Sequence, residues 1–386
     1  MIVLAELYNL RHGRQRMAGL VPKSDFIALE GKTSLVAGGE PPLLKRHRDA
    51  FEQYAHDKSL GYAGYWHHWV VNEDVRAMLA DMLHLEADDI SLLGSASEGI
   101  SQVVSSIDWQ SGDNAVTADL EYASGKFAFS HLKKFGVDAR FVKSHDKYIN
   151  AEQVIEACDE KTRLVYLSQV NYNTGQHLDI ELLSAELAAH SIPLLNDVSH
   201  AMGVVPVDGR QADFVVCCGY KWLLGTQTGI FAWNRQRWPT FEPRGVGWRS
   251  TSSHEDKENY MPRNDANRAQ VGNSNHLDVY LLRESLKYIQ DIGVNEIRQH
   301  VLRLGDKLID SLTAMNIEVI TPTAHDERAG NICFAHVDPR GIVDRAAAEN
   351  ILIWGDVGRV RVSIHLFNDE EDIDTLVDFL ATDQLQ

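Results

Sequence analysis

The chain has 386 residues, of which 44% are hydrophobic and 24% charged, so it is long enough to bury a large core and predicts one large and one smaller domain. Its formal net charge of -18, without a sustained basic cluster, argues against a nucleic-acid partner. Four cysteines without CxxC spacing, and the lack of an apolar run of membrane-spanning length, predict a cytoplasmic protein that is neither secreted nor embedded in a membrane.

A segment rich in aromatic residues and histidine, residues 61–69, is the first distinctive feature. Trp66 and His67 can line a substrate pocket, or the segment can be a packed loop. His67 and His68 are adjacent, and adjacent residues do not share a helix face, so we predict no metal site here.

A turn of small residues, 94–99, follows a strand candidate at 90–93 and precedes an apolar helical run. Ala96 and Ser97 would open that helix, where free backbone N–H groups and the positive end of the dipole favour a phosphate. Small residues are also ordinary helix caps, so the turn alone is weak evidence for a phosphate site and supports one only together with other predicted ligand contacts. Further along, Tyr122 can stack on a planar ring or can be an ordinary half-buried tyrosine.

The centre of the chain alternates strand and helix patterns. Strand candidates at 163–170, 192–195 and 214–217 are interrupted by a helical pattern from Asp179 onward. This alternation predicts a parallel sheet that binds ligands at the carboxyl ends of its strands. Asp197 and Lys221 each follow one of these strands and therefore fall at that edge.

These two residues are the groups that a pyridoxal 5'-phosphate (PLP) enzyme supplies. A lysine holds the aldehyde of the cofactor as a Schiff base, and a carboxylate keeps the pyridine nitrogen protonated. An exposed lysine and a helix-capping aspartate are the ordinary alternatives, and the lysine alternative is favoured when Lys221 is taken alone. The occurrence of Asp197 and Lys221 on consecutive predicted strands favours the cofactor site.

Beyond residue 270 the pattern changes to a long helix, strand candidates at 317–320, 331–336 and 359–364, and a closing helix from Glu370. This predicts a smaller mixed α/β domain that the long helix joins to the first. In the last strand, Arg361 can clamp a carboxylate, or it can lie on the solvent face. Arg359 has the same facing, so the assignment between the two arginines stays open.

Together these residues resemble the class V aminotransferases, a fold-type I PLP family. Residues 170–175, 197–200 and 218–221 are most similar to kynureninases, and residues 360–371 are similar to the selenocysteine lyase and isopenicillin N epimerase-like branch. The resemblance implies an α/β fold-type I PLP-dependent transferase with a mostly parallel seven-stranded sheet. It further implies a large PLP-binding domain at 30–265 and a small domain made of 1–29 plus 266–386, which includes the bridging helix.

The resemblance also implies a homodimer with shared active sites and a set of residue roles. Lys221 would form the Schiff base, Asp197 would pair with the pyridine nitrogen, and His200 would lie near the ring hydroxyl. Further cofactor contacts are expected from Ala96, Ser97, Tyr122, Asn171 and Tyr220, and from Asn273 and Ser274 of a loop that reaches the phosphate of the other subunit. The expected substrate contacts are Arg361, Trp66 and His67.

The predicted function is transamination or lysis of a small α-amino acid through an external aldimine. Residues 351–356 lack the mobile-loop cysteine of desulfurases, which argues against persulfide transfer. Residues 247–250 keep part of the Trp-Trp-Gly-His segment of kynureninases, so hydrolytic C–C cleavage stays an alternative. A non-catalytic PLP-fold binding protein is a second alternative, against which the intact Lys221, Asp197 and Arg361 argue.

Overall fold

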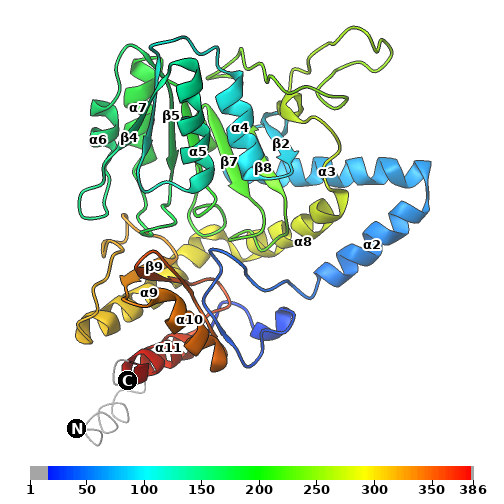
Figure 1. Ribbon diagram of the computed structural model, residues 1–386. Helices are drawn as coiled ribbons and strands as arrows, with labels where there is room; N and C mark the ends of the chain where they lie inside the picture. Colours follow the sequence, from blue (N-terminus) through cyan, green and yellow to red (C-terminus); the bar gives the residue numbers. More distant parts are fainter. Residues whose placement is uncertain (1–15, 384–386) are drawn as a thin grey trace, which may run out of the picture.

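A seven-stranded sheet forms the centre of the computed structural model, which describes residues 16–383 (Figure 1). The first 15 residues of the predicted small domain therefore lie outside the described residues. The strands of this sheet are β2 (Ile90–Leu93), β3 (Asn114–Ala118), β4 (Asp138–Val142), β5 (Thr162–Ser168), β6 (Leu194–Asp197), β7 (Phe214–Cys218) and β8 (Gly229–Trp233).

The strand order is β2-β8-β7-β6-β5-β3-β4. Strand β8 is antiparallel to both of its neighbours, and the other neighbouring strands run parallel to each other. The predicted mostly parallel seven-stranded sheet is therefore confirmed. The carboxyl ends of β5, β6 and β7 meet at one edge, which brings Asp197 and the segment after Cys218 together.

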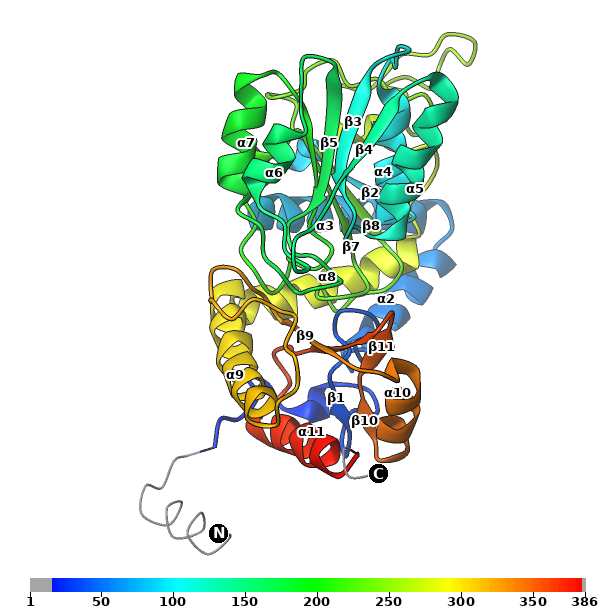
Figure 2. The same cartoon turned by 60° about the vertical axis from the view of Figure 1, so that its left-hand side comes forward.

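Both faces of the sheet are covered, which is why its central strands are apolar throughout. Along β5, Leu164 and Tyr166 pack into the core that includes residues of α4 and α5, whereas Val165 and Leu167 pack into the core shared with α3 and α7. Figure 2 shows these helices on the two faces. The helices around the sheet are α3 (Tyr62–Leu83), α4 (Ala96–Ser106), α5 (Ala123–His131), α6 (Ala151–Glu156) and α7 (Ile180–Ala189), and α2 (His47–Ser59) packs against α3 away from the strands (Figure 1).

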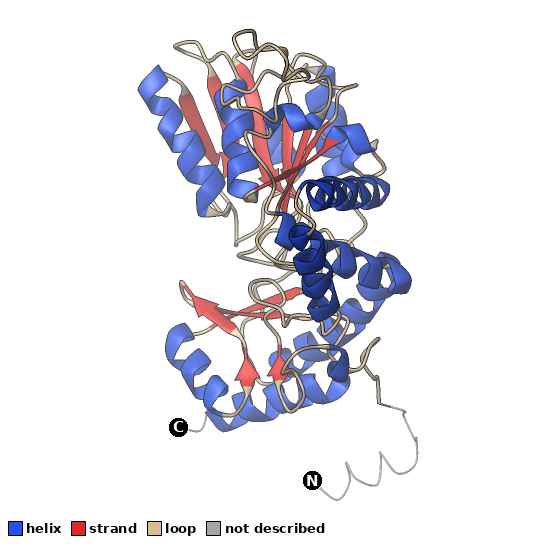
Figure 3. Ribbon diagram, turned by 90° about the vertical axis from the view of Figure 1, so that its right-hand side faces the viewer, coloured by secondary structure: helices blue, strands red, loops and turns tan. Residues whose placement is uncertain are grey.

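A second unit with short strands lies beside the carboxyl edge of the large sheet (Figure 3). Its three-stranded antiparallel sheet has the order β11-β12-β9, and β1 pairs with β10 in a separate parallel pair. The strands are β1 (Thr33–Ser34), β9 (Asn331–Ala335), β10 (Ile351–Leu352), β11 (Trp354–Asp356) and β12 (Arg359–Ser363), and the helices are α8 (His276–Ile292), α9 (Val294–Ala314), α10 (Pro339–Ala348) and α11 (Glu370–Asp383). The pairing of β1 with β10 places residues 33–34 in this unit, beyond the boundary at residue 30 that the sequence predicts.

Two sequence predictions in this part of the chain are corrected by the structure. The long helix after residue 270 is two helices, because Gly293 takes a φ of 92° between α8 and α9, a conformation that a helix does not allow. The predicted strand at 317–320 is reduced to a single bridge from Val319 to Phe334. No helix among residues 16–383 is long and apolar enough to cross a membrane.

Candidate active site

A cavity of about 250 Å³ opens at the carboxyl ends of β5, β6 and β7. Seven of the predicted site residues line it: Ala96, Ser97, Tyr122, Asp197, His200, Tyr220 and Lys221. The remaining lining residues are Ser95, Ile100, Ser124, Ser168, Val170, Tyr172, Ser199, Cys218 and Gln227. The expectation that the strand ends bring the lysine and the aspartate to one place agrees with this arrangement.

Lys221 lies in the tight connection between β7 and β8. The N–H of Gly219 donates to the carbonyl of Thr228 at 2.7 Å, and the N–H of Gly225 donates to the carbonyl of Gly219 at 2.9 Å. These backbone hydrogen bonds join the two ends of the connection, so they restrict the conformation of the segment that carries Lys221. The antiparallel turn from β7 into β8 thus fixes the lysine at the sheet edge.

His200 lies within hydrogen-bonding distance of Lys221, with its Nε2 3.2 Å from the lysine Nζ. The other ring nitrogen, Nδ1, faces the Nε1 of Trp222 at 3.3 Å and the side-chain amide of Asn331 at 3.0 Å. An indole N–H only donates, so Nδ1 accepts and the neutral imidazole carries its proton on Nε2. Burial holds the pKa of His200 well below its usual value, which favours this neutral form.

Asp197 ends β6, and both of its carboxylate oxygens have a donor. The Tyr166 hydroxyl donates to Oδ2 at 3.1 Å, and the Ser199 N–H donates to Oδ1 at 2.9 Å. Burial, with the charge of Asp197, raises the pKa of Tyr166 well above its usual value, so the hydroxyl stays a donor. Its ring fits only because residue 125 is glycine, since a Cβ there would lie 2.0 Å from the Cε1 of Tyr166.

The N-terminus of α4 forms one wall of the cavity. The Ser95 hydroxyl caps the helix by accepting from the N–H of Glu98 at 3.1 Å. Ser97 follows in the first turn, and its hydroxyl lies 2.7 Å from that of Ser124. The first N–H groups of a helix lack intrahelical partners, so this wall can bind an anion through N–H groups and hydroxyls.

Aromatic rings form another wall. Tyr122 precedes α5, and its ring meets that of Tyr172 edge to face at a centroid distance of 5.2 Å. The Lys221 Nζ lies 5.8 Å from the ring centroid of Tyr122 and 5.7 Å from that of Tyr220. Tyr172 is not among the predicted site residues, although it belongs to the kynureninase-like motif at residues 170–175, which also contains the predicted contact Asn171.

Asn171 is a predicted cofactor contact that does not line the cavity. Its side-chain amide donates to the carbonyl of Leu120 at 3.2 Å, and its Oδ1 accepts from the N–H of Asn173 at 2.9 Å. The second bond is the local turn that asparagine favours after a strand. In this conformation Asn171 shapes the loop that presents Tyr172.

Glu121 is a buried acid that sequence reasoning missed. Its carboxylate accepts from the backbone N–H and from the hydroxyl of Ser168, which lines the cavity. Burial raises the pKa of Glu121 to about 7, and the nearby charge of Asp197 contributes to the shift. An acidic residue before an aromatic one carries no local signal for such a position, because the contact depends on the packing of β5.

Arg361 lies next to the cavity rather than in its lining. Its two terminal nitrogens donate to the carbonyls of Gly38 and Tyr172 at 3.2 and 3.4 Å. Burial lowers the pKa of Arg361 to about 10, and within residues 16–383 the side chain forms no ion pair. Arg359, by contrast, pairs with Asp356 at 3.3 Å.

Four predicted contacts lie away from this cavity. Trp66 and His67 point outward from α3, with Trp66 52% exposed and His67 bonded to Asp57 at 3.0 Å. Asn273 is exposed just before α8, and the Ser274 hydroxyl donates to the side chain of Asn72 at 2.8 Å. A single subunit therefore does not bring these residues to its own cavity.

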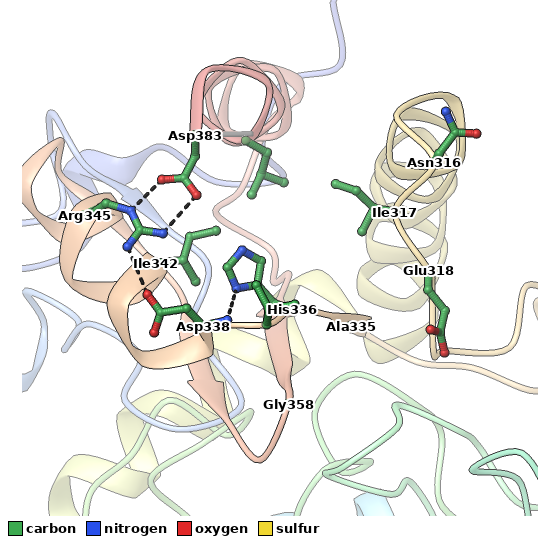
Figure 4. A pocket seen from close by; sticks show the side chains of 12 residues that line it. Asn316, Ile317, Glu318, Ala335, His336, Asp338, Ile342, Arg345, Gly358 and Asp383 are labelled. Carbon is green, nitrogen blue, oxygen red and sulfur yellow. Dashed lines mark hydrogen bonds and ion pairs between the residues drawn. The ribbon is translucent and has the colours of Figure 1, made fainter. Parts of the chain in front are cut away.

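A larger hollow of about 650 Å³ lies in the second unit (Figure 4). Arg345 dominates it and pairs with Asp383 and with Asp338, at 3.0 and 3.2 Å. No predicted site residue lines this hollow. Among residues 16–383, no group of three or more histidine, cysteine and acidic side chains is arranged to hold a metal ion.

Known proteins place the chain in one family. The model of the family "Aminotransferase class-V" matches residues 51–376. A kynureninase of Geobacillus thermodenitrificans is 28% identical over 69% of this chain and 66% of its own length, and a probable cysteine desulfurase of Methanothermobacter thermautotrophicus is 25% identical over 79% of this chain and 81% of its own.

Solved structures show the same fold. A variant of C-DES with glycine covalently linked to its PLP cofactor superposes with a TM-score of 0.87 at 23% identity, over 94% of this chain and 99% of the other. Another structure of C-DES describes it as a cystine C–S lyase in complex with cysteine persulfide. The fold-type I prediction is thereby confirmed. The chain belongs to the aminotransferase class-V family and is a PLP-dependent enzyme, as its central motifs predict.

Proposed function

We propose that this enzyme acts on a small α-amino acid as a transaminase or lyase, with Lys221 as the covalent attachment point of PLP and Asp197 as the partner of the pyridine nitrogen. One observation supports this most directly. The amine and the carboxylate line the same cavity of about 250 Å³, where Lys221 contacts His200 and Asp197 accepts from Tyr166 and Ser199. The amine and the carboxylate are thus each left for a different group of one ligand.

The residues present fit the cofactor. PLP supplies an aldehyde that condenses with amines and a ring that withdraws electrons from the bound amino acid. The N-terminus of α4, with Ser97 and Ser124, suits the phosphate, and Tyr122 can cover the ring. The two donors on Asp197 hold its carboxylate in one orientation, which keeps an opposing positive charge on the ring nitrogen favourable.

Lys221 is also placed to move a proton. The tautomer of His200 directs an N–H toward the lysine Nζ, and this contact is a hydrogen bond only when Nζ carries a lone pair. An unprotonated Nζ is the form that can take the proton from the α-carbon of the substrate and return it. His200 therefore holds the lysine in its working orientation.

Arg361 is our choice for the carboxylate of the substrate. Arg359 is already paired with Asp356, whereas the hydrogen bonds of Arg361 go to carbonyls and its Nε has no partner. One of the two carbonyls that Arg361 contacts belongs to Gly38. Gly38 packs close to His200, because a Cβ at residue 38 would lie 3.2 Å from the His200 Cε1. The guanidinium is thus next to the reacting groups.

The state of the cysteines favours a transaminase or lyase over an enzyme that transfers sulfur through a cysteine persulfide. Cys217, Cys218 and Cys333 are buried, and burial raises the pKa of each thiol. Cys158, which is half-buried, has its pKa raised to about 11 for the same reason. A persulfide relay needs an accessible thiolate, so we do not assign one here, although a similar protein is named a probable cysteine desulfurase.

Kynureninase-like hydrolysis is the second candidate. It is favoured by the similarity to a kynureninase and by the segment from Cys218 to Lys221, in which Tyr220 and Cys218 both line the cavity. The two candidates share the cavity, the lysine and the aspartate, and differ in the product released.

We further propose that the active unit is a homodimer. Tyr62, Trp66 and Val70 are spaced four residues apart on α3, so they form one helix face, and they are 78%, 52% and 60% exposed. An exposed apolar strip of this kind marks a protein interface, and a second copy of the chain is the occupant that we assign. Asn273 and Ser274 would then serve the cavity of the other subunit.

Borohydride reduction tests the attachment point. The purified protein is expected to absorb visible light, and reduction followed by peptide mass spectrometry should locate the cofactor on Lys221. Lys221→Ala should abolish both signals, whereas Lys126→Ala, whose amine bonds to the carbonyl of Asp119, should keep them. A label on another lysine, or none, would contradict the assignment.

A panel of kynurenine, cysteine derivatives and alanine separates the reaction classes. Transamination leaves the amine form of the cofactor on the protein, elimination releases ammonia, and hydrolysis of kynurenine releases an aromatic amine. Product analysis of whichever amino acid reacts identifies the class.

A further inference from the structure

Glu121 is a carboxylic acid that lies directly behind the wall of the cavity that holds Lys221. It belongs to the connection between β3 and α5, and the residue is 2% exposed. One residue supplies a donor to each of its oxygens, because the Ser168 N–H donates to Oε1 at 2.9 Å and the Ser168 hydroxyl donates to Oε2. Ser168 itself lines the cavity. Ser168 therefore lies between the buried acid and a ligand in the cavity.

The same serine is the neighbour of Asp197 in the sheet. Ser168 ends β5, Asp197 ends β6, and the two residues are register partners in these parallel strands. Partners in neighbouring strands lie on the same face of a sheet, so both side chains face α4 and α5. Tyr166, two residues before Ser168, lies on that face as well and donates to Asp197. Glu121 is thus one residue away from the carboxylate that the proposed function assigns to the ring nitrogen.

The surroundings of Glu121 allow it to change its charge near neutral pH. Burial is the main reason why the pKa of Glu121 is raised to about 7, and the charge of Asp197 adds to the shift. Burial also raises the pKa of Tyr166 well above its usual value, so this neighbour stays neutral. On the cavity side the basic groups are Lys221 and His200, and burial keeps His200 neutral. Because charges act on each other mutually, ionised Glu121 favours a positive charge next to Asp197.

The protonation state of Glu121 also decides which way the Ser168 hydroxyl points. Oε1 accepts from a backbone N–H, so a proton on the carboxyl group resides on Oε2. That oxygen then donates to the Ser168 Oγ, and the hydroxyl hydrogen of Ser168 turns toward the cavity. When the carboxyl group is ionised, Ser168 donates to it and offers only lone pairs to the cavity. One proton therefore changes both the charge behind Ser168 and the hydrogen bonding of the cavity wall.

We propose that Glu121 is a positioning residue for the cofactor ring: ionised, it favours a protonated pyridine nitrogen next to Asp197, and neutral, it opposes one through the Ser168 hydroxyl. This inference rests on the proposed function, in which Asp197 pairs with that nitrogen. Ionised Glu121 adds a negative charge in a buried place, where charges interact more strongly than in water. It also keeps Ser168 an acceptor. Both effects act in the same direction on the ring nitrogen.

The test compares PLP binding to the apoproteins of the wild type and three variants at pH 6 and pH 8. Glu121→Gln copies the shape and the donor of the neutral acid, and Ser168→Ala keeps the acid but removes the hydroxyl. Asp119→Asn is the matched control, because Asp119 lies in the same connection but accepts from the N–H of Ser144 at 3.2 Å. Affinities are compared between proteins at one pH, so the titration of the free cofactor cancels.

At pH 6, where Glu121 is mostly protonated, Glu121→Gln should bind PLP within about twofold of the wild type. At pH 8, where Glu121 is mostly ionised, the variant should bind PLP about threefold to tenfold more weakly, because the second negative charge is missing. Asp119→Asn should match the wild type at both pH values.

An infrared titration of the PLP-free proteins follows the proton itself. The carbonyl band of a protonated carboxyl group should disappear between pH 6 and pH 8 in the wild type and be absent from Glu121→Gln. In Ser168→Ala the band should persist to higher pH, because the lost hydrogen bond favours the carboxylate.

A loss of PLP affinity that is equal at pH 6 and pH 8 would indicate a packing role and overturn the inference, as would unchanged affinity at both. If Glu121→Gln does not fold, the infrared comparison of wild type and Ser168→Ala decides, and a band that is the same in both proteins overturns the inference. Wild-type protein that binds no PLP at either pH overturns the proposed function itself. PLP binding without the pH-dependent difference overturns only the role of Glu121.

Discussion

The two hollows described above differ in size and in how their charges are arranged. The larger one, in the second unit, holds an arginine whose charge is balanced by Asp338 and Asp383 of the same unit. The smaller one holds Lys221 and Asp197, which do not pair, beside the positive end of α4. Volume is therefore a poor guide to chemistry in this molecule, and charge left for a ligand is a better one.

Matched carboxylate substitutions in the two hollows give the largest expected contrast. Asp197→Asn should lower kcat/KM by about 10²- to 10⁴-fold, because the charge that favours a protonated ring nitrogen is lost. Asp383→Asn should leave kcat/KM unchanged, since that carboxylate only balances Arg345. Steady-state kinetics with the amino acid found in the panel measures both. Equal losses in the two variants would contradict the contrast.

Only the smaller cavity is expected to depend on a second subunit. Trp66→Glu places a charge on the exposed face of α3 and should halve the molar mass seen by light scattering at micromolar concentration, with activity falling in step. Phe127→Glu is the control, because Phe127 is 72% exposed on α5, away from that face. A Trp66→Glu dimer with full activity would show that the sites are complete within one chain.

His365 connects the second unit to the Lys221 segment, and it makes stability depend on pH. Its Nε2 donates to the carbonyl of Trp222 at 2.9 Å, and burial lowers the pKa of His365 to about 4. The unfolded chain binds this proton near pH 6.5 and the folded chain does not, so the free energy of unfolding falls as the pH drops from 6.5 toward 4. Between pH 7.5 and 5 the loss from this group is about 2 kcal/mol.

Urea unfolding at the two pH values measures this contribution. His365→Gln should lose less stability on acidification than the wild type does, by that same amount. His131→Gln, at the exposed end of α5, should behave as the wild type. An equal loss in wild type and His365→Gln would show that other groups carry the acid sensitivity.

The smallest effect is expected from Arg345→Ala in the larger hollow. The substitution removes exposed ion pairs whose members do not line the smaller cavity, so kcat and KM should stay within error of the wild type. A fall in activity would mean that the two hollows are coupled through the second unit.

The sequence predicts the sheet and its ligand edge well, because alternating strand and helix patterns are local. The same locality explains Asp197, the last residue of β6, and Lys221, which follows β7, whereas His200 is predicted only through the resemblance to the family. Tyr166 and Asn331 were missed, since their contacts with Asp197 and His200 join distant parts of the chain. Trp66 and Asn273 are predicted at the site, but Trp66 lies on the exposed face of α3 and Asn273 on the exposed loop before α8. Their predicted roles therefore depend on a second subunit.

Gly125 has a consequence for anyone who diversifies this enzyme by directed evolution. The outer helix α5 looks like a safe place for a mutant library, because only Gly125 and Phe129 of its residues are buried. Any side chain at 125, however, would displace the ring of Tyr166 and, with it, a donor to Asp197. A library that varies position 125 but not position 166 should therefore yield clones that fold and yet have reduced activity. A smaller residue at position 166 would make room for the new side chain but would lack the hydroxyl that donates to Asp197.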